Sequence, residues 1–216
     1  MEDKRVIKTK RNLKRTMIEM ICDMPFEKIT VSELCRLGET SRITFYTHYD
    51  DKYDLAEEIF GDYVKEAVTD YYRLQERNNP NRLALFGYYN MLDCILNLYS
   101  RNRRIFAMIS SERNPYLYSA FYQHIFRNVY DYIIRHSAQM RPKYPPRQMA
   151  ALICNGLWGV ITECCTREGD FESVRGDIMS MFNDILQSGI FSILERKYVL
   201  SDMIFGVRLS NKLLDG

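Results

Sequence analysis

Residues 26–52 read FEKITVSELCRLGETSRITFYTHYDDK, and this stretch decides the fold that the sequence predicts. Thr30 stands before an apolar-periodic segment, and Glu33 follows it three residues later. This is the spacing of a capping box, in which the threonine hydroxyl accepts a free backbone N–H and the glutamate reaches back to the cap. We therefore expect a short helix over 31–37, ended by a turn at Gly38–Glu39.

A second short helix is expected directly after this turn. Thr40 or Ser41 can cap it, and its pattern runs to about Tyr49. Phe45 and Tyr49 lie four residues apart, so both can face the first short helix, whereas Tyr46 cannot face the same way. Two short helices joined by a tight turn, with an amphipathic helix in front of them, predict a helix-turn-helix.

The remaining residues of the second short helix are chemically suited to contact nucleic acid. An arginine can bind guanine through two hydrogen bonds, while hydroxyls and an imidazole suit phosphate oxygens. The residues of these types are Arg42, Thr44, Tyr46, Thr47 and His48. Lys52 follows in the first turn of the next helix, where backbone N–H groups already favour an anion.

The rest of the chain is also helical in pattern. An N-terminal amphipathic helix is expected ahead of Pro25, with an apolar stripe made by Leu13, Met17, Met20, Ile21 and Met24. Asp50–Asp51 can cap a long helix that runs to about Arg77. Further helices are expected near 82–100, 102–111, 115–138, 146–168, 171–195 and 199–214. No alternating run bounded by hairpin turns indicates a strand, so the predicted fold class is all-α.

Composition and charge narrow the function further. The 216 residues are 46% hydrophobic and 27% charged, which is typical of a globular chain with a sizeable core. The net charge is only +2, yet residues 1–15 carry seven Lys and Arg against Glu2 and Asp3. A basic N-terminal segment on a slightly acidic remainder indicates a polyanionic partner.

Several other classes of protein are not indicated. There is no export signal and no apolar stretch long enough to span a bilayer, so we expect a cytoplasmic protein without a membrane partner. The six cysteines lack metal-ligand or CxxC spacing and are expected to be buried thiols. No Gly-rich phosphate loop, nucleophile elbow or metal motif points to an enzyme, and we expect no cofactor and no metal.

Residues 29–31, 41–49 and 52–55 together resemble the TetR family of transcriptional regulators (TetR/AcrR-like). They are similar to the threonine-capped second helix of that family, to its S-R-x-T-F-Y-x-H-[FY] recognition helix and to its K-x-x-L entry into helix four. The resemblance implies a helix-turn-helix DNA-binding domain over 1–60 and a helical dimerisation and effector-binding domain over 61–216. Glu39 departs from the pattern, because many members have glycine in this turn and a left-handed glutamate is strained.

The resemblance also assigns DNA contacts by position. The family touches DNA from its second helix, from its recognition helix and from the start of helix four. The corresponding residues here are Val31, Ser32, Ser41, Arg42, Ile43, Thr44, Tyr46, Thr47, His48 and Lys52. Of these, Tyr46 and Lys52 fall on phosphate-contacting positions.

The C-terminal region has suitable material for an effector pocket, and the resemblance implies one. Aromatic residues recur there at helical spacing, and ligand sites are concave and mostly apolar. The expected pocket residues are Tyr63, Phe86, Tyr89, Phe106, Phe121, Tyr122 and Trp158. The alternative is that these aromatics form only the core.

A homodimer interface is expected from the two helices over 146–168 and 171–195. A glycine inside a helix costs about 1 kcal/mol relative to alanine, so close approach of another helix should offset it. Two apolar stripes and two glycines give the expected interface residues Ile153, Gly156, Gly159, Val160, Ile178, Phe182 and Ile185. The alternative is that both stripes face the core of their own subunit.

Together these expectations describe a regulator that binds a palindromic operator in double-stranded DNA as a homodimer. We expect it to repress transcription until a small-molecule effector releases it. The alternatives are a transcriptional activator and a regulator controlled by a protein partner. A helical interaction module without DNA binding would leave the basic N-terminal segment unexplained.

Overall fold

The computed structural model describes residues 4–165 and 171–186, and every helix or strand element within them is a helix. The predicted all-α class is confirmed. In chain order the elements are α1 (Lys4–Asp23), the 3-10 turn η1 (Phe26–Lys28), α2 (Val31–Leu37), α3 (Arg42–Tyr46), α4 (Lys52–Asn78), α5 (Ala84–Arg101), α6 (Arg103–Phe106), α7 (Pro115–Arg135), α8 (Ser137–Met140), α9 (Pro146–Cys165) and α10 (Phe171–Ile185). None of these helices is long and apolar enough to cross a membrane.

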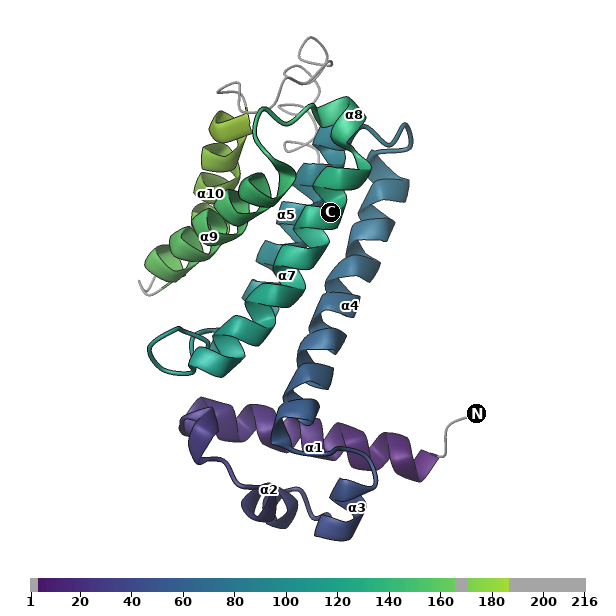
Figure 1. The fold of residues 1–216 in the computed structure, drawn as a ribbon, viewed down its shortest axis with the longest axis vertical. Coiled ribbons are helices and arrows are strands. Elements are labelled where there is room, and N and C mark those ends of the chain that lie inside the picture. The colour runs from purple at the N-terminus through teal and green to yellow at the C-terminus, as the bar shows by residue number, and fades with distance from the viewer. Residues whose placement is uncertain (1–3, 166–170, 187–216) are drawn as a thin grey trace, which may run out of the picture.

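The helices form a small head and a larger body joined by one long helix (Figure 1). The head consists of α1, α2 and α3, and lies across the lower end of α4. The body consists of α5 to α10: α5 and α7 run beside α4, while α9 and α10 pack on the outer side of α5 and α7. This arrangement confirms the predicted N-terminal three-helix unit with a helix-turn-helix and a larger helical C-terminal region.

The core of the head is built from the apolar stripe of α1. Leu13, Met17 and Ile21 are fully buried, and they meet Leu34 of α2 and Phe45 of α3. At about 25 cal/mol for each Å² of apolar surface removed from water, this burial is what holds two short helices that could not persist alone. The head therefore depends on α1 as its support.

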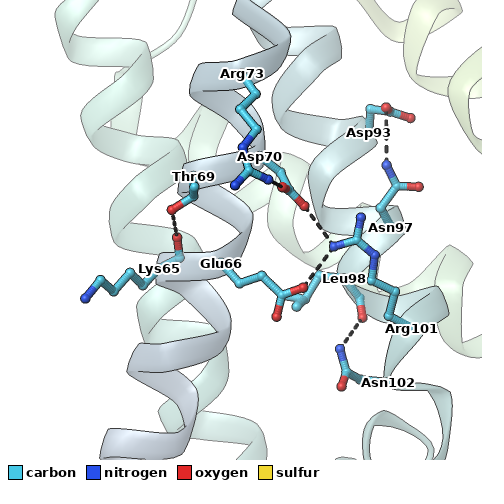
Figure 2. A network of polar contacts seen from close by, with 10 residues as sticks. All are labelled: Lys65, Glu66, Thr69, Asp70, Arg73, Asp93, Asn97, Leu98, Arg101 and Asn102. Atoms are coloured by element: carbon cyan, nitrogen blue, oxygen red, sulfur yellow. Dashed lines mark hydrogen bonds and ion pairs between the residues drawn. The ribbon is translucent and has the colours of Figure 1, made fainter.

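Ion pairs fix α4 against α5 along the outer edge of the body (Figure 2). Arg101 binds Glu66 at 2.9 Å and Asp70 at 2.8 Å, and Asp70 also binds Arg73 at 2.9 Å. Exposed pairs of this kind contribute about 0–1 kcal/mol each. Their main effect is on register, because one guanidinium connects two successive turns of α4 to the end of α5.

Several predicted helix boundaries need correction. The second short helix ends at Tyr46 instead of near Tyr49, and the helix expected over 102–111 is only α6. There Asn114 donates to the carbonyl of Met108 at 2.7 Å, which stabilises a turn before α7 starts. The helix expected over 115–138 ends at Arg135. The helix expected over 199–214, and the end of the one over 171–195, lie outside the described residues.

Far from the head, a buried polar cluster that we call the upper latch joins α4, α5 and α7. Tyr132 donates to the carbonyl of Ala84 at 2.6 Å, and Asn79 donates to Gln75 at 2.6 Å. Gly87 lies against this cluster, and a Cβ there would overlap the Tyr132 hydroxyl and lie 2.7 Å from the Gln75 amide nitrogen. Only glycine therefore lets α5 approach the latch.

Two glycine substitutions test the latch. Gly87→Ala should lower the free energy of unfolding by about 1–3 kcal/mol, because it overpacks a buried site. Gly61→Ala is the matched control in α4, where an added Cβ would meet nothing within 4 Å. It should raise the free energy of unfolding by about 0.5–1 kcal/mol, because alanine is the better helix former. Urea unfolding measures both, and equal effects would contradict the assignment.

Candidate DNA-binding site

The short helix α3 is held from below and exposes its opposite face. Ser41 caps it by accepting the N–H of Thr44 at 3.0 Å. Phe45 is fully buried and Tyr49 nearly so, which confirms the predicted inward pair. Tyr46 points away, with 51% of its surface exposed, so the three aromatics are not equally buried, as expected.

The exposed face of α3 carries the residues that the sequence proposed for DNA contact. Ser41, Arg42, Ile43, Tyr46 and Thr47 are exposed, while Thr44 and His48 are half-buried. Within the described part of the chain, no ion pair or hydrogen bond occupies the Arg42 guanidinium. Ile43 is 85% exposed, which makes it the most exposed of the large apolar side chains described. An apolar side chain in that position suits a thymine methyl group.

Hydroxyl groups on α3 are ordered by local hydrogen bonds. The hydroxyls of Ser41 and Thr44 lie 2.8 Å apart, and Thr47 donates to the carbonyl of Ile43 at 2.8 Å. These bonds fix side-chain rotamers before any partner arrives. Each hydroxyl oxygen keeps lone pairs, so the exposed ones can still accept from a base edge.

The helix α2 exposes fewer side chains for DNA contact than the resemblance implied. Thr30 accepts the N–H of Glu33 at 3.2 Å, but the Glu33 carboxylate binds Arg36 at 2.7 Å instead of returning to the cap. The predicted capping box is therefore only half formed. Ser32 is exposed, whereas Val31 is half-buried and packs against the core, so the expected contact from the Val31 side chain is not supported.

The two residues of the turn between α2 and α3, Gly38 and Glu39, differ in backbone conformation. Glu39 has φ 50°, so the strained left-handed glutamate expected from the sequence is present. Gly38 has an ordinary φ of −83° and serves a different purpose. A Cβ at Gly38 would lie 3.0 Å from the carbonyl of Leu34 and 3.4 Å from the hydroxyl of Thr16, so glycine permits close packing on α1.

The ammonium group of Lys52 is already hydrogen-bonded within the chain. Its ammonium donates to the carbonyl oxygens of Phe26, Glu27 and Ile29, each at 3.0 Å. A lysine has three N–H donors, so all of them are accepted within the chain. The expected phosphate contact from this side chain is therefore not supported. No residue pattern indicates this role, because the acceptors are backbone atoms that any residue would supply.

The basic N-terminal segment is partly neutralised by α4. Lys10 binds Glu58 at 3.0 Å, and Lys14 binds both Glu58 at 2.7 Å and Asp62 at 2.5 Å. These two lysines hold α1 to α4. The basic residues of α1 that remain on the exposed surface include Lys4, Lys8, Arg11 and Arg15.

Phe26 is the centre of a joint between head and body that sequence reasoning missed. Its N–H is accepted by the Asn114 side chain at 2.7 Å, and its carbonyl is one of the three bound by Lys52. Its ring lies 5.6 Å from that of Tyr116 and 5.3 Å from that of Tyr53. We call these five residues the Phe26 joint. Asn114 is 1% exposed, and only its place before Pro115 could have drawn attention to it.

Some of the residues expected for an effector pocket surround a cavity. A cavity of about 30 Å³, which we call the Trp158 cavity, lies between α5, α7 and α9. Four expected residues line it, namely Phe106, Phe121, Tyr122 and Trp158. The other three expected residues do not line this cavity. Tyr89 is buried and donates to Asn183 at 2.5 Å. The Tyr63 ring lies 5.7 Å from that of Phe106, outside the cavity lining, and Phe86 is not among the lining residues either.

The expected dimer residues fall on two different faces. Ile153, Ile178 and Phe182 are at most 3% exposed within a single chain, so their side chains lie in its own core. This is the core-facing alternative for those positions. Val160 and Ile185 are half-buried, whereas Gly156 and Gly159 are exposed. Their exposed neighbours include Leu152 and Met181, at 53% and 46%.

Searches of protein-family models and of curated proteins find no match to this chain. Solved structures do match over most of its length. A protein of Syntrophomonas wolfei assigned to the TetR family of transcriptional regulators has a TM-score of 0.70, with 10% identity over 83% of this chain and 95% of that one. The chain has the TetR fold.

Two further solved structures with a similar fold are named for opposite regulatory effects. NalD of Pseudomonas aeruginosa, the secondary repressor of a multidrug efflux pump, has a TM-score of 0.58, with 17% identity over 82% of this chain and 96% of that one. DhaS, a dihydroxyacetone kinase operon activator, has a TM-score of 0.53, with 18% identity over 83% and 96%. At this level of identity the likeness concerns the fold.

Removing the Lys52 ammonium should destabilise the head. Lys52→Met keeps the aliphatic stem but leaves three carbonyl groups without their donor, so we expect a loss of about 2–3 kcal/mol in the free energy of unfolding. Lys52→Arg, which keeps the charge and several donors, is the control and should lose less. Chemical denaturation measures both, and an unchanged stability of Lys52→Met would refute this role.

The pairing of Glu58 should make stability depend on acid pH. Burial opposes its ionisation, but hydrogen bonds from Lys14 and Lys10 prevail and lower the pKa of Glu58 to about 2. A carboxylate with a depressed pKa stabilises the fold above its unfolded pKa and loses that effect as pH falls through the folded one. The stability difference between wild type and Glu58→Gln should therefore shrink between about pH 4.5 and pH 2. A constant difference would contradict the pairing.

Proposed function

We propose that this chain is a DNA-binding transcriptional regulator that reads a palindromic operator as a homodimer. The observation that supports this most directly is the exposed face of α3, where an unpaired Arg42 and an 85% exposed Ile43 project from a helix held by buried Phe45. Packing within the head does not explain why a large apolar side chain and a free guanidinium are exposed side by side on this helix. Both suit the base edges of the major groove.

The proposed roles follow from exposure and chemistry. Arg42 would read guanine, Ile43 would contact a thymine methyl group, and Tyr46 would bind a phosphate. Thr44, Thr47 and His48 would add polar contacts along α3, and Ser32 would approach from α2. The outer basic residues of α1 would contribute attraction without sequence preference. No catalytic reaction is assigned to the chain, and no cofactor.

Substitutions on α3 can distinguish a residue that contacts bases from one that contacts phosphates. Arg42→Ala should cost about 1–3 kcal/mol at one or two base pairs and relax the sequence preference there. Tyr46→Phe should instead weaken binding to all duplexes by similar factors, because phosphate contacts carry no sequence information. Selection of bound DNA from random duplexes, repeated with each variant, measures both. A uniform loss in Arg42→Ala would move this residue to the phosphate-binding group.

We place the homodimer interface on the exposed face formed by Leu152, Gly156, Gly159 and Met181. The first three share one stripe of α9, and Met181 lies on the neighbouring helix α10. Among the described residues, a Cβ added at Gly159 would meet nothing within 4 Å, so packing within this part of the chain does not explain the glycine. A second copy packing on the same face would form a four-helix interface about a two-fold axis.

A charge on this face tests the interface. Leu152→Glu should give a monomer or a much weaker dimer, and DNA affinity should fall because a single half-site holds poorly. Ile134→Glu is the matched control, since Ile134 is an exposed apolar residue of similar exposure, 45%, on α7. It should stay dimeric. Sedimentation at micromolar concentration decides, and a folded, fully dimeric Leu152→Glu would remove this face from consideration.

An effector would act through α7. This helix lines the Trp158 cavity with Phe121 and Tyr122, and its first residues reach the Phe26 joint through Tyr116. It also contacts α4 where His124 lies 2.9 Å from Glu57. A ligand that displaced α7 would therefore move the turn that supports α2 and α3, in addition to tilting α4.

We propose repression by promoter occlusion, with release by a small molecule. The alternatives are activation and control by a protein partner. The operator obtained by selection is placed before a reporter gene, and reporter expression is compared with and without the protein. Repression requires higher expression when the protein is deleted. Activation requires lower expression. A regulator that no metabolite releases but a protein partner does would support the last alternative.

A further inference from the structure

A second cavity lies next to the Trp158 cavity and opens toward solvent. We call it the Arg135 cavity; it holds about 70 Å³ between α4, α5 and α7. Its walls are mainly apolar, and its polar groups include Tyr71, Asn128 and Arg135. The two cavities share two wall residues, Ile95 and Ile125.

The order of wall residues places the two cavities end to end. Along α7, the Trp158 cavity is lined from Phe121 to Ile125 and the Arg135 cavity from Ile125 to Arg135. Along α5 the order is reversed, and Ile95 again lies at the junction. At 1.5 Å per residue, the part of α7 that lines them is about 20 Å long. The space is therefore long and narrow, with an isoleucine from each helix as a partition.

The partition is made of side chains that can move. Ile95 and Ile125 are both half-buried, and neither makes a polar contact. A change of rotamer would join the two cavities without breaking a hydrogen bond. At roughly 10–15 Å³ for each water-sized group, the joined space holds about seven to ten such groups in a row. This suits an alkyl chain of medium length and excludes a broad ring system.

The inner part of this space is electrically neutral. Cys94 lies in the wall of the Arg135 cavity and Cys154 in that of the Trp158 cavity, and burial raises the pKa of both thiols to about 12. The Tyr132 hydroxyl is already bound to the carbonyl of Ala84. The inner walls therefore offer apolar contact and no charge, which suits a hydrocarbon tail.

The one charged wall residue of the two cavities is Arg135, at the solvent end. Its Nε donates to the carbonyl of Asp131 at 3.2 Å. Over residues 4–165 and 171–186, its two terminal amino groups have no acidic or hydrogen-bonded partner. A guanidinium with two free N–H groups binds a carboxylate through a pair of parallel hydrogen bonds.

We propose that the two cavities form one binding site for a single-chain amphiphile with a carboxylate head. The carboxylate binds Arg135, and the alkyl tail passes between Ile95 and Ile125 to reach Trp158. This deepens the proposed function, because such a ligand is the effector that α7 would sense. Binding itself can be measured without DNA, so the two proposals can fail separately.

Trp158 makes the test direct, because it is the single tryptophan of the chain. Tryptophan emission of the full chain is titrated with sodium decanoate below its micelle concentration, and with sodium hexanoate and decanol. Decanoate should give a saturable change in emission. Hexanoate, too short to pass the partition, should raise the thermal midpoint without changing the emission. Each methylene added between these lengths should tighten binding by about fourfold.

Two variants locate the head and the tail. Arg135→Ala should weaken decanoate binding by about 10- to 100-fold and leave decanol binding within twofold. Arg127→Ala, an exposed arginine of α7 outside both cavities, is the control and should change neither. Ile125→Phe should close the partition and abolish the emission change. Ile95→Phe does the same from α5 and replaces it if Ile125→Phe fails to fold.

Three results would overturn the site: no decanoate response, equal decanoate affinity in wild type and Arg135→Ala, or an emission change that survives both partition variants. Wild type that binds its selected operator yet ignores decanoate would overturn this site alone. Wild type that binds decanoate but no duplex would overturn the proposed function and leave the site standing. Vesicles of anionic phospholipid should give no emission change, because the ligand is a free single chain.

Discussion

The backbone of Phe26 is the point on which the arrangement of head and body depends. Its N–H is bound by Asn114, from the turn before α7, and its carbonyl by Lys52, from the first turn of α4. Two elements distant in sequence therefore hold one residue of the turn between α1 and α2. The ring is fully buried against Tyr53 and Tyr116, so any rotation of the turn would expose it. Because α2 and α3 follow this turn directly, their orientation relative to the body depends on the position of Phe26.

The same constraint explains how the two ends of α7 are related. Its N-terminal turn lies in the Phe26 joint, and its C-terminal half lines the Arg135 cavity and joins the upper latch through Tyr132. Interiors packed at crystal-like density do not absorb small displacements gradually. The helix α7 therefore connects the lining of the Arg135 cavity to the joint by continuous packing. The head contacts the body through the Phe26 joint as well as through the continuous backbone of α4.

The sequence predicted the fold well where local rules decide it. The Thr30 cap, the inward pair Phe45 and Tyr49, and the Asp51 cap of α4 all depend on residues within a few positions of each other. It could not predict contacts made to backbone atoms far along the chain. The sequence pattern therefore predicts a phosphate contact for Lys52, whereas its partners in the structure are carbonyl oxygens, which every residue type carries alike.

The residues expected for the dimer interface and the effector pocket show the same limit in the body. Apolar periodicity identifies which residues of α9 and α10 lie on one stripe, but not which stripe the rest of the chain covers. Ile153, Ile178 and Phe182 are covered by the chain itself, and the exposed stripe is displaced around each helix. Aromatic residues likewise indicate a core and a cavity equally well. Only the packing of α5, α7 and α9 shows which four of the seven line the space around Trp158.

The unbroken helix α4 turns small internal changes into large displacements. Its 27 residues extend for about 40 Å, with one end held by the upper latch and the other carrying the head. A tilt of about 5° at the latched end would displace the far end by about 3–4 Å over that length. In a symmetric pair the two displacements add, which approaches the spacing of two base pairs. In the proposed homodimer, a ligand in a small cavity would in this way change the separation of the two α3 helices without reshaping the body.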